Sequence, residues 1–81
     1  MKKLLYFGAS WCGSCRKLLP IVKKEAPEKG YDLEVLDMDD EDGEYFAEKY
    51  AVRGLPTIIV LENGKETKRA VGNTAWLEVQ Q

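Results

Sequence analysis

Short apolar runs typical of buried strands alternate along this chain with segments of helical periodicity. Residues 4–7 form the first run, and residues 13–29 then carry an apolar stripe at helical spacing. Pro27 and Gly30 end that helix, and an alternating apolar pattern follows over residues 33–39. Strand, helix and strand in this order predict a right-handed crossover that leaves the two strands parallel.

The second half of the chain predicts an antiparallel hairpin. Asn63-Gly64 separates two strand-like runs and is the strongest two-residue turn signal in the sequence. With the parallel pair, this hairpin gives an α/β fold with a four-stranded mixed sheet. The other expected elements are a helix from Asp39 or Asp40 to Tyr50, a strand over residues 55–61, an outer strand over residues 65–71, and a last helix capped by Asn73 or Thr74 and carrying Trp76, Leu77 and Val79.

Length and charge limit the class of protein. Residues 1–81 are long enough for one small domain. A net charge of −2 without a basic face disfavours nucleic-acid binding. The apolar stretch after Lys2 and Lys3 is shorter than the roughly 7–15 residues of an export signal, and no run reaches the roughly 20 of a membrane span. We therefore expect a monomer in the cytoplasm, away from membranes.

The only two cysteines lie in Trp11-Cys12-Gly13-Ser14-Cys15, where the first strand gives way to the first helix. Two thiols at this spacing share one face of a helix and can form and break a small disulfide. The free N–H groups and partial positive charge of a helix N-terminus favour a thiolate. A structural bridge over so short a loop would remove little chain entropy. The motif therefore predicts thiol–disulfide exchange, with Cys12 as the attacking thiolate and Cys15 as the resolving thiol.

Two other uses of the motif remain open at this point. Two thiolates also suit a soft metal such as Cu(I), although small copper chaperones run strand, helix, strand, strand, helix, strand. A binding module without turnover is a further alternative. The acidic stretch from Asp37 to Glu44 lacks the glycine and terminal glutamate of a calcium loop and is interpreted as a solvated helix N-terminus, so no metal is expected.

The motif around Cys12, together with Gly54-Leu55-Pro56-Thr57, resembles the thioredoxin superfamily. The resemblance runs nearly end to end, and includes Pro20 inside the first helix and Gly72 after the fourth strand. By this resemblance, residues 1–81 are expected to correspond to a thioredoxin from its second strand onwards, without the family's first strand and helix. It resembles a minimal, glutaredoxin-sized thioredoxin. The hallmarks of glutathione-binding glutaredoxins are not evident.

The resemblance implies a function and a set of site residues. It implies reduction of protein disulfides with no cofactor beyond the Cys12–Cys15 pair, and electrons supplied by a thioredoxin reductase-type donor or, alternatively, by glutathione. The opposite direction, as oxidant or isomerase, is less favoured. The Leu55–Pro56 bond is implied to be cis. The residues implied to contact disulfide-containing client proteins are Trp11, Gly13, Ser14, Leu55, Pro56, Val71 and Gly72.

Three residues depart from the thioredoxin pattern. Tyr6 stands where the family carries a buried aspartate beneath the resolving cysteine, and Asp37 stands where a lysine often accompanies that aspartate. We expect Asp37 to take over proton transfer, since the chain has no histidine. Ser14 replaces a proline and adds donors near the sulfurs, which predicts a somewhat less reducing pair. The reduction potential of a Ser14→Pro variant tests this expectation.

Overall fold

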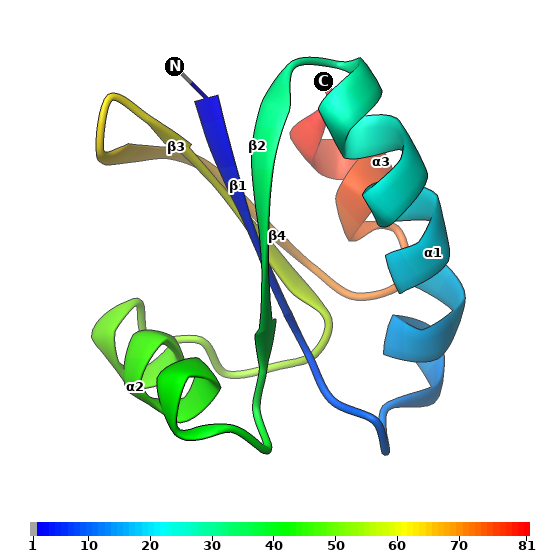
Figure 1. Ribbon diagram of the computed structural model, residues 1–81, viewed down its shortest axis with the longest axis vertical. Helices are drawn as coiled ribbons and strands as arrows, with labels where there is room; N and C mark the ends of the chain where they lie inside the picture. Colours follow the sequence, from blue (N-terminus) through cyan, green and yellow to red (C-terminus); the bar gives the residue numbers. More distant parts are fainter. Residues whose placement is uncertain (1) are drawn as a thin grey trace.

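The computed structural model describes residues 2–81 and contains a β-α-β-α-β-β-α chain (Figure 1). Residue 1 of the expected domain lies outside the described residues. This order is the one that the sequence predicts, and it differs from that of the copper chaperones. The elements are β1 (Lys2–Gly8), α1 (Gly13–Glu28), β2 (Tyr31–Asp37), α2 (Glu41–Lys49), β3 (Thr57–Glu62), β4 (Lys65–Val71) and α3 (Ala75–Val79).

The four strands form one mixed sheet in the order β2-β1-β3-β4. β1 pairs parallel with β2, and β3 pairs antiparallel with both β1 and β4. The β3–β4 turn is the expected one, because Asn63 and Gly64 have φ values of +54° and +85° and the flanking residues pair directly. β4 is an edge strand, as predicted, and its first five residues, all exposed and polar, keep that part of the edge polar.

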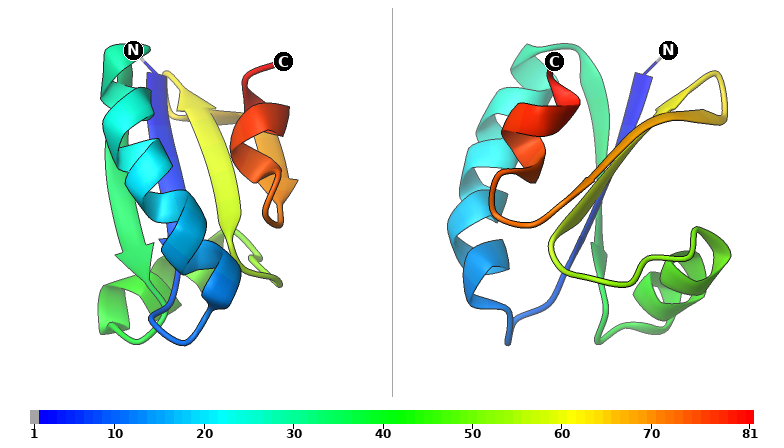
Figure 2. Two further views of the ribbon diagram at one scale, coloured as in Figure 1. Left: turned by 90° about the vertical axis from the view of Figure 1, so that its right-hand side faces the viewer. Right: turned by 180° about the vertical axis from the view of Figure 1, so that it is seen from behind.

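Helices cover both faces of the sheet (Figure 2). α1 and α3 pack on one face, where Val22, Trp76 and Tyr6 belong to a single apolar cluster. α2 packs on the other face, where Ala47 meets Phe7. The central strand β1 is buried on both faces from Leu4 to Gly8, as its continuous apolar run predicts.

The helices confirm most sequence expectations. α1 continues through Pro20, because its apolar stripe of Leu18, Val22 and Ala26 stays buried beyond the proline. Asp40 is the N-cap of α2, and Thr74 is the N-cap of α3. Within residues 2–81, no helix combines the length and the apolar character that crossing a membrane requires.

Three strands differ in their bounds from the predicted ones, since β1 extends beyond residues 4–7 at both ends and β2 and β3 are shifted along the chain. β2 spans residues 31–37 rather than 33–39, because Gly30 turns the chain with a φ of +86° and pairing with β1 begins at once. β2 ends where the Asp40 N–H binds the Asp37 carbonyl and forms a turn. β3 begins at Thr57 rather than Leu55, because Pro56 has no N–H to donate to a ladder.

Candidate active site

The register of the sheet brings distant parts of the chain to one end. Gly8 is paired with Asp37, and Phe7 with Thr57, which is in turn paired with Val71. The loop to α1, the start of α2, the loop before β3 and the loop after β4 therefore leave the sheet at this same end (Figures 1 and 2). This end carries every site residue that the sequence predicts.

Cys12 and Cys15 form a disulfide across the first turn of α1, with their Cα atoms 5.2 Å apart. Cys12 is the N-cap of the helix, and its Sγ accepts the Cys15 backbone N–H at 3.2 Å. Cys12 is partly exposed, whereas Cys15 is only 3% exposed. The two cysteines therefore differ in solvent exposure and in how well the protein would stabilise a thiolate. Cys12 is the better placed to carry a negative charge.

Asp39 fixes the loop that leads into Cys12. The Trp11 indole Nε1 donates to Asp39 Oδ1 at 3.1 Å, and Ser10 Oγ donates to Asp39 Oδ2 at 3.3 Å. Trp11 nevertheless remains 69% exposed, so its ring is held in place while presenting a bare apolar surface beside the disulfide. From the sequence, Asp39 is expected only at an acidic helix N-terminus, because its contact with Trp11 spans 28 residues and leaves no local pattern.

A hydrogen bond joins the loop before β3 to the loop after β4. The Leu55–Pro56 bond is cis, as the resemblance implies, and the Gly72 N–H donates to the Pro56 carbonyl at 2.8 Å. Val71 is 51% exposed, and Leu55 and Gly72 are partly exposed, whereas Pro56 is buried. Val71, Leu55 and Gly72 form a shallow surface, and the buried Pro56 lies beneath it.

Arg69 anchors the loop before β3 and was not singled out from the sequence. Its Nη2 donates to the Tyr50 carbonyl at 2.6 Å, at the C-cap of α2. The same guanidinium is held by Glu66 at 2.8 Å, and each of these groups shifts the pKa of the other, lowering that of Glu66 and raising that of Arg69. This cation therefore ties the helix end to the edge strand at the point where the chain turns towards Pro56.

Tyr6 fills the position beneath Cys15. It is fully buried, and its hydroxyl donates to the Cys15 carbonyl at 3.0 Å. Burial raises the pKa of the Tyr6 hydroxyl to about 12. Tyr6 is therefore a neutral hydrogen-bond donor that holds the first turn of α1 against the sheet.

The raised pKa makes stability depend on alkaline pH. The folded chain keeps the Tyr6 proton up to about pH 12, whereas an unfolded chain loses it near the ordinary value of 10.0. The free energy of unfolding should therefore keep the full contribution of this group below pH 10.0 and lose it as pH rises towards 12. Urea unfolding followed by circular dichroism, at about pH 8 and about pH 11, measures the loss. It should be smaller in Tyr6→Phe, and an equal loss in both proteins would contradict this expectation.

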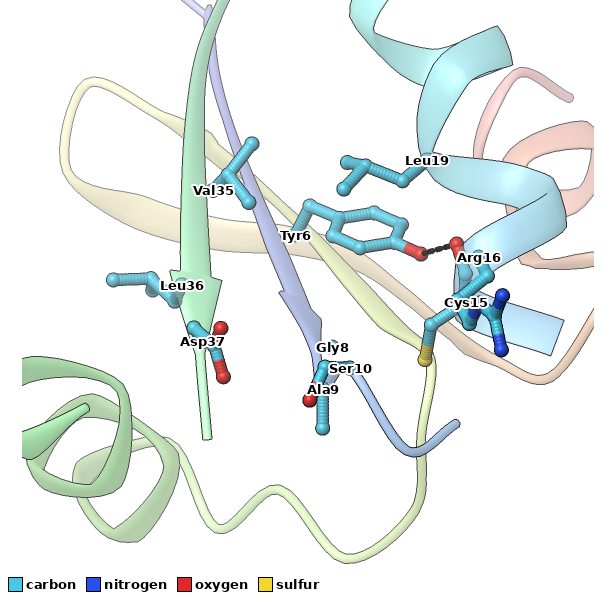
Figure 3. A pocket seen from close by; sticks show the side chains of 10 residues that line it. All are labelled: Tyr6, Gly8, Ala9, Ser10, Cys15, Arg16, Leu19, Val35, Leu36 and Asp37. Carbon is cyan, nitrogen blue, oxygen red and sulfur yellow. Dashed lines mark hydrogen bonds between the residues drawn. The ribbon is translucent and has the colours of Figure 1, made fainter. Parts of the chain in front are cut away.

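A cavity of about 240 Å³ lies between α1 and the end of the sheet (Figure 3). We call it the cavity behind Cys15. Gly8 packs closely against its neighbours at one side of this cavity, since a methyl group added there would lie 2.9 Å from the Tyr6 ring and 3.4 Å from Cys15 Sγ. Asp37 lines it because residues paired across β1 and β2 share a face, and Asp37 is paired with Gly8. Its lining residues are Tyr6, Gly8, Ala9, Ser10, Cys15, Arg16, Leu19, Val35, Leu36 and Asp37.

In the part of the chain that the structure describes, the acidic residues do not gather into a metal site. Over residues 2–81, no three histidine, cysteine, aspartate or glutamate side chains lie close enough together to hold an ion. Glu41, Asp42 and Glu44 instead occupy the first turn of α2, where negative charge is favourable.

Comparison with known proteins identifies the family. The family model described as Thioredoxin matches residues 1–80. The thioredoxin of Chlamydia trachomatis is 38% identical over 69 residues, which cover 85% of this chain and 67% of that protein. The thioredoxin of Bacillus subtilis is 33% identical over 66 residues, covering 82% of this chain and 64% of that protein. The chain thus spans about two thirds of the length of these relatives.

The solved structures agree. A mutant thioredoxin from Halobacterium salinarum superposes with a TM-score of 0.84 at 29% identity, covering 98% of this chain and 68% of that chain. With the matching family model and the Cys12–Cys15 disulfide at the start of α1, these likenesses show that the chain belongs to the thioredoxin family and is a protein-disulfide oxidoreductase.

Proposed function

We propose that this protein reduces disulfides in client proteins. The observation that carries the proposal is the asymmetry of the cysteine pair, in which Cys12 is accessible and stabilised at the helix N-terminus while Cys15 is buried one turn on. The Cys12 thiolate attacks a client disulfide, forms a mixed disulfide and expels one client thiolate. Cys15 then attacks Cys12 Sγ, closes the intramolecular disulfide and releases the second client thiolate.

Client proteins dock on the surface around Cys12. Trp11 and Val71 offer exposed apolar area, and Gly13 and Ser14 leave the start of α1 open to an approaching chain. Leu55 is the residue whose backbone pairs with the client, beside Pro56 and Gly72.

Asp37 accepts the proton that Cys15 must lose before it attacks. Its carboxylate lines the same cavity as Cys15, and it is oriented by the Asp39 N–H, which donates to Asp37 Oδ1 at 2.8 Å. In the proposed transfer, water that enters this cavity relays the proton from Cys15 to Asp37. Tyr6 is unsuited to the task because its hydroxyl is committed to the Cys15 carbonyl and keeps its proton to about pH 12.

Asp37→Asn is expected to slow decay of the mixed disulfide by roughly a hundredfold, the lower range for loss of a general base. The amide keeps an oxygen for the Asp39 N–H, so the fold is preserved. Rapid-quench analysis of single turnovers would measure the decay. Asp40→Asn removes a neighbouring charge and should decay at the wild-type rate. Equal rates for all three proteins would exclude a catalytic role for Asp37.

The oxidised protein must be reduced by a partner. A thioredoxin reductase-type enzyme or glutathione are the donors that we propose, in the cytoplasm, where thiols are kept reduced. The redox centre is the cysteine pair itself, so the proposed reaction needs no dissociable cofactor.

The reduction potential of the Cys12–Cys15 pair tests the proposed direction. Equilibration against glutathione or dithiothreitol should give a value near or below about −250 mV, towards the thioredoxin end of the range. A value above about −180 mV would make the protein an oxidant or isomerase and overturn the proposal.

A further inference from the structure

A groove of about 490 Å³ lies between the first half of α1 and the loop after β4, which run close to each other (Figure 2). We call it the α1 groove. On the helix its lining residues share one face, since neighbours on a helix face lie three or four positions apart. The residues that line the groove are Gly13, Ser14, Lys17, Leu18, Ile21 and Asn73. Gly13 and Ser14 directly follow Cys12, so the groove begins next to the attacking cysteine.

The α1 groove combines apolar side chains with a single charge. Leu18 is 8% exposed and Ile21 is 46% exposed, so an apolar side chain of a partner can be buried against both. Lys17 is exposed and is the only charged residue among the described residues that line the groove. The two ion pairs within residues 2–81 do not involve its ammonium. The groove therefore suits a segment that brings both an apolar and an acidic side chain.

The two sides of the site around Cys12 differ in charge. On the α1 side, the first turn contains no acidic residue, and the charges of Arg16 and Lys17 add to the positive end of the helix. On the α2 side, the first turn carries three acidic residues, and Asp39 in the preceding loop binds Trp11. These helices cover opposite faces of the sheet. An acidic client segment is therefore attracted to the α1 groove and repelled from the α2 side.

We propose that the α1 groove selects among clients by binding an extended segment next to the attacked cysteine, with an acidic side chain on Lys17 and an apolar side chain on Ile21. Lys17 is five residues beyond Cys12, about 7.5 Å along the helix, and an extended chain covers this distance in about two residues. Ile21 is one turn further, or about two more client residues.

This spacing defines the preferred client segment. The acidic residue should lie about two positions from the client cysteine and the apolar residue about four, since alternate residues of an extended chain point to the same side. The inference rests on the proposed function, because it concerns which clients that reaction prefers.

Activated peptides test the preference for acidic clients. Each peptide has one cysteine in a disulfide with thionitrobenzoate, glutamate or lysine two positions away, and leucine four positions away. One series places these residues before the cysteine and the other places them after it. The Cys12 thiolate of reduced protein attacks the peptide sulfur, forms the mixed disulfide and expels thionitrobenzoate, whose absorbance measures the rate. Each rate is divided by the rate of the same peptide with dithiothreitol, which removes differences in intrinsic reactivity.

In one of the two series, the wild-type protein should prefer the glutamate peptide about threefold, because an exposed ion pair changes a rate or equilibrium constant by up to about fivefold. The preference should disappear at about 1 M salt, where the Debye length falls to about 3 Å. Equal rates for glutamate and lysine peptides in both series would overturn the proposal.

Two charge reversals on α1 locate the source of the preference. Lys17→Glu should reverse it, to about threefold in favour of the lysine peptide. Lys24→Glu makes the same change of charge at an exposed position two turns further along α1, outside the groove, and should keep the wild-type preference. A change in the reactivity of Cys12 cancels in this ratio of rates. Equal shifts in the two variants would attribute the preference to net charge and overturn the proposal.

The apolar contact is tested through Ile21. The wild-type protein should prefer leucine to alanine at the fourth position by roughly threefold, for partial burial of the leucine side chain. Ile21→Gln should lose this preference. Leu77→Gln removes an exposed apolar side chain from α3, outside the groove, and should keep it. The same loss in both variants would overturn the assignment of the apolar contact to the groove.

A separate measurement distinguishes failure of this inference from failure of the proposed function. Reduced wild-type protein is mixed with insulin, a generic disulfide substrate, and one turnover is followed. Reduction of insulin without any preference among the peptides would refute only the role of the α1 groove. Absence of insulin reduction would refute the proposed function, whatever the peptides show.

Discussion

Replacing Cys15 with serine is expected to convert the protein into a trap for its clients. Cys12 would still attack a client disulfide, but no second thiol would resolve the mixed disulfide. Intramolecular attack has an effective concentration that can exceed about 10⁵ M, so release should slow by roughly a thousandfold or more. Non-reducing electrophoresis of a mixture with insulin would measure the covalent complex.

The matched control is Cys12→Ser, which should neither reduce the client nor accumulate a complex. The contrast follows from the exposure of the two sulfurs, since Cys12 is partly exposed and Cys15 is 3% exposed. If Cys12→Ser formed the stable complex instead, the roles assigned to the two cysteines would be reversed.

Of all glycine-to-alanine substitutions in this chain, Gly43→Ala is expected to lower the free energy of unfolding most. Gly43 lies in α2 with its Cα against β2, and a Cβ there would overlap the backbone carbonyl of Asp37. That backbone cannot yield easily, because the Asp40 N–H binds the Asp37 carbonyl and the next residue, Met38, donates its N–H to Gly8. We expect a loss of about 3 kcal/mol in the free energy of unfolding, against a helix-propensity gain of only about 1 kcal/mol.

Urea unfolding measures the loss, and Gly13→Ala provides the control. Gly13 also lies in a helix, but a Cβ there meets no atom within 4 Å, so the substitution should keep stability unchanged or raise it by up to about 1 kcal/mol. Because Gly43 presses on the residue that we assign to proton transfer, Gly43→Ala should also slow mixed-disulfide decay. Equal stability of the two alanine variants would mean that α2 can move away from β2 at little cost.

Local patterns predicted the elements well. The apolar run at residues 4–7, the stripe on α1 and the Asn63-Gly64 turn each depend on neighbours in sequence, and each is present. The first and last residues of the strands were predicted less accurately, because a strand extends only as far as the neighbouring strand pairs with it. The pairing of β3 with β4 skips Thr67, since Val60 is opposite Lys68 and Leu61 is opposite Glu66, and this register shift left no signal in the sequence because it arises from the pairing itself.

Contacts between distant residues explain what the sequence did not reveal. Asp39 binds Trp11 across 28 positions, and Arg69 binds Tyr50 across 19. Gly43 was not noticed either, since a glycine inside a helix signals a close approach only when the opposing backbone is known. The cavity behind Cys15 likewise depends on the pairing that places Asp37 beside Gly8.

The two tryptophans occupy opposite environments, which gives the protein two separate optical reporters. Trp76 is 2% exposed in the core, and its Nε1 donates to Glu25 at 2.8 Å. Its emission should lie at shorter wavelength, resist quenching by iodide and change when the chain unfolds. Trp11 lies in solvent beside Cys12, so iodide should quench it selectively and a bound client should shield it. Stopped-flow fluorescence can therefore follow docking and unfolding in one unlabelled sample.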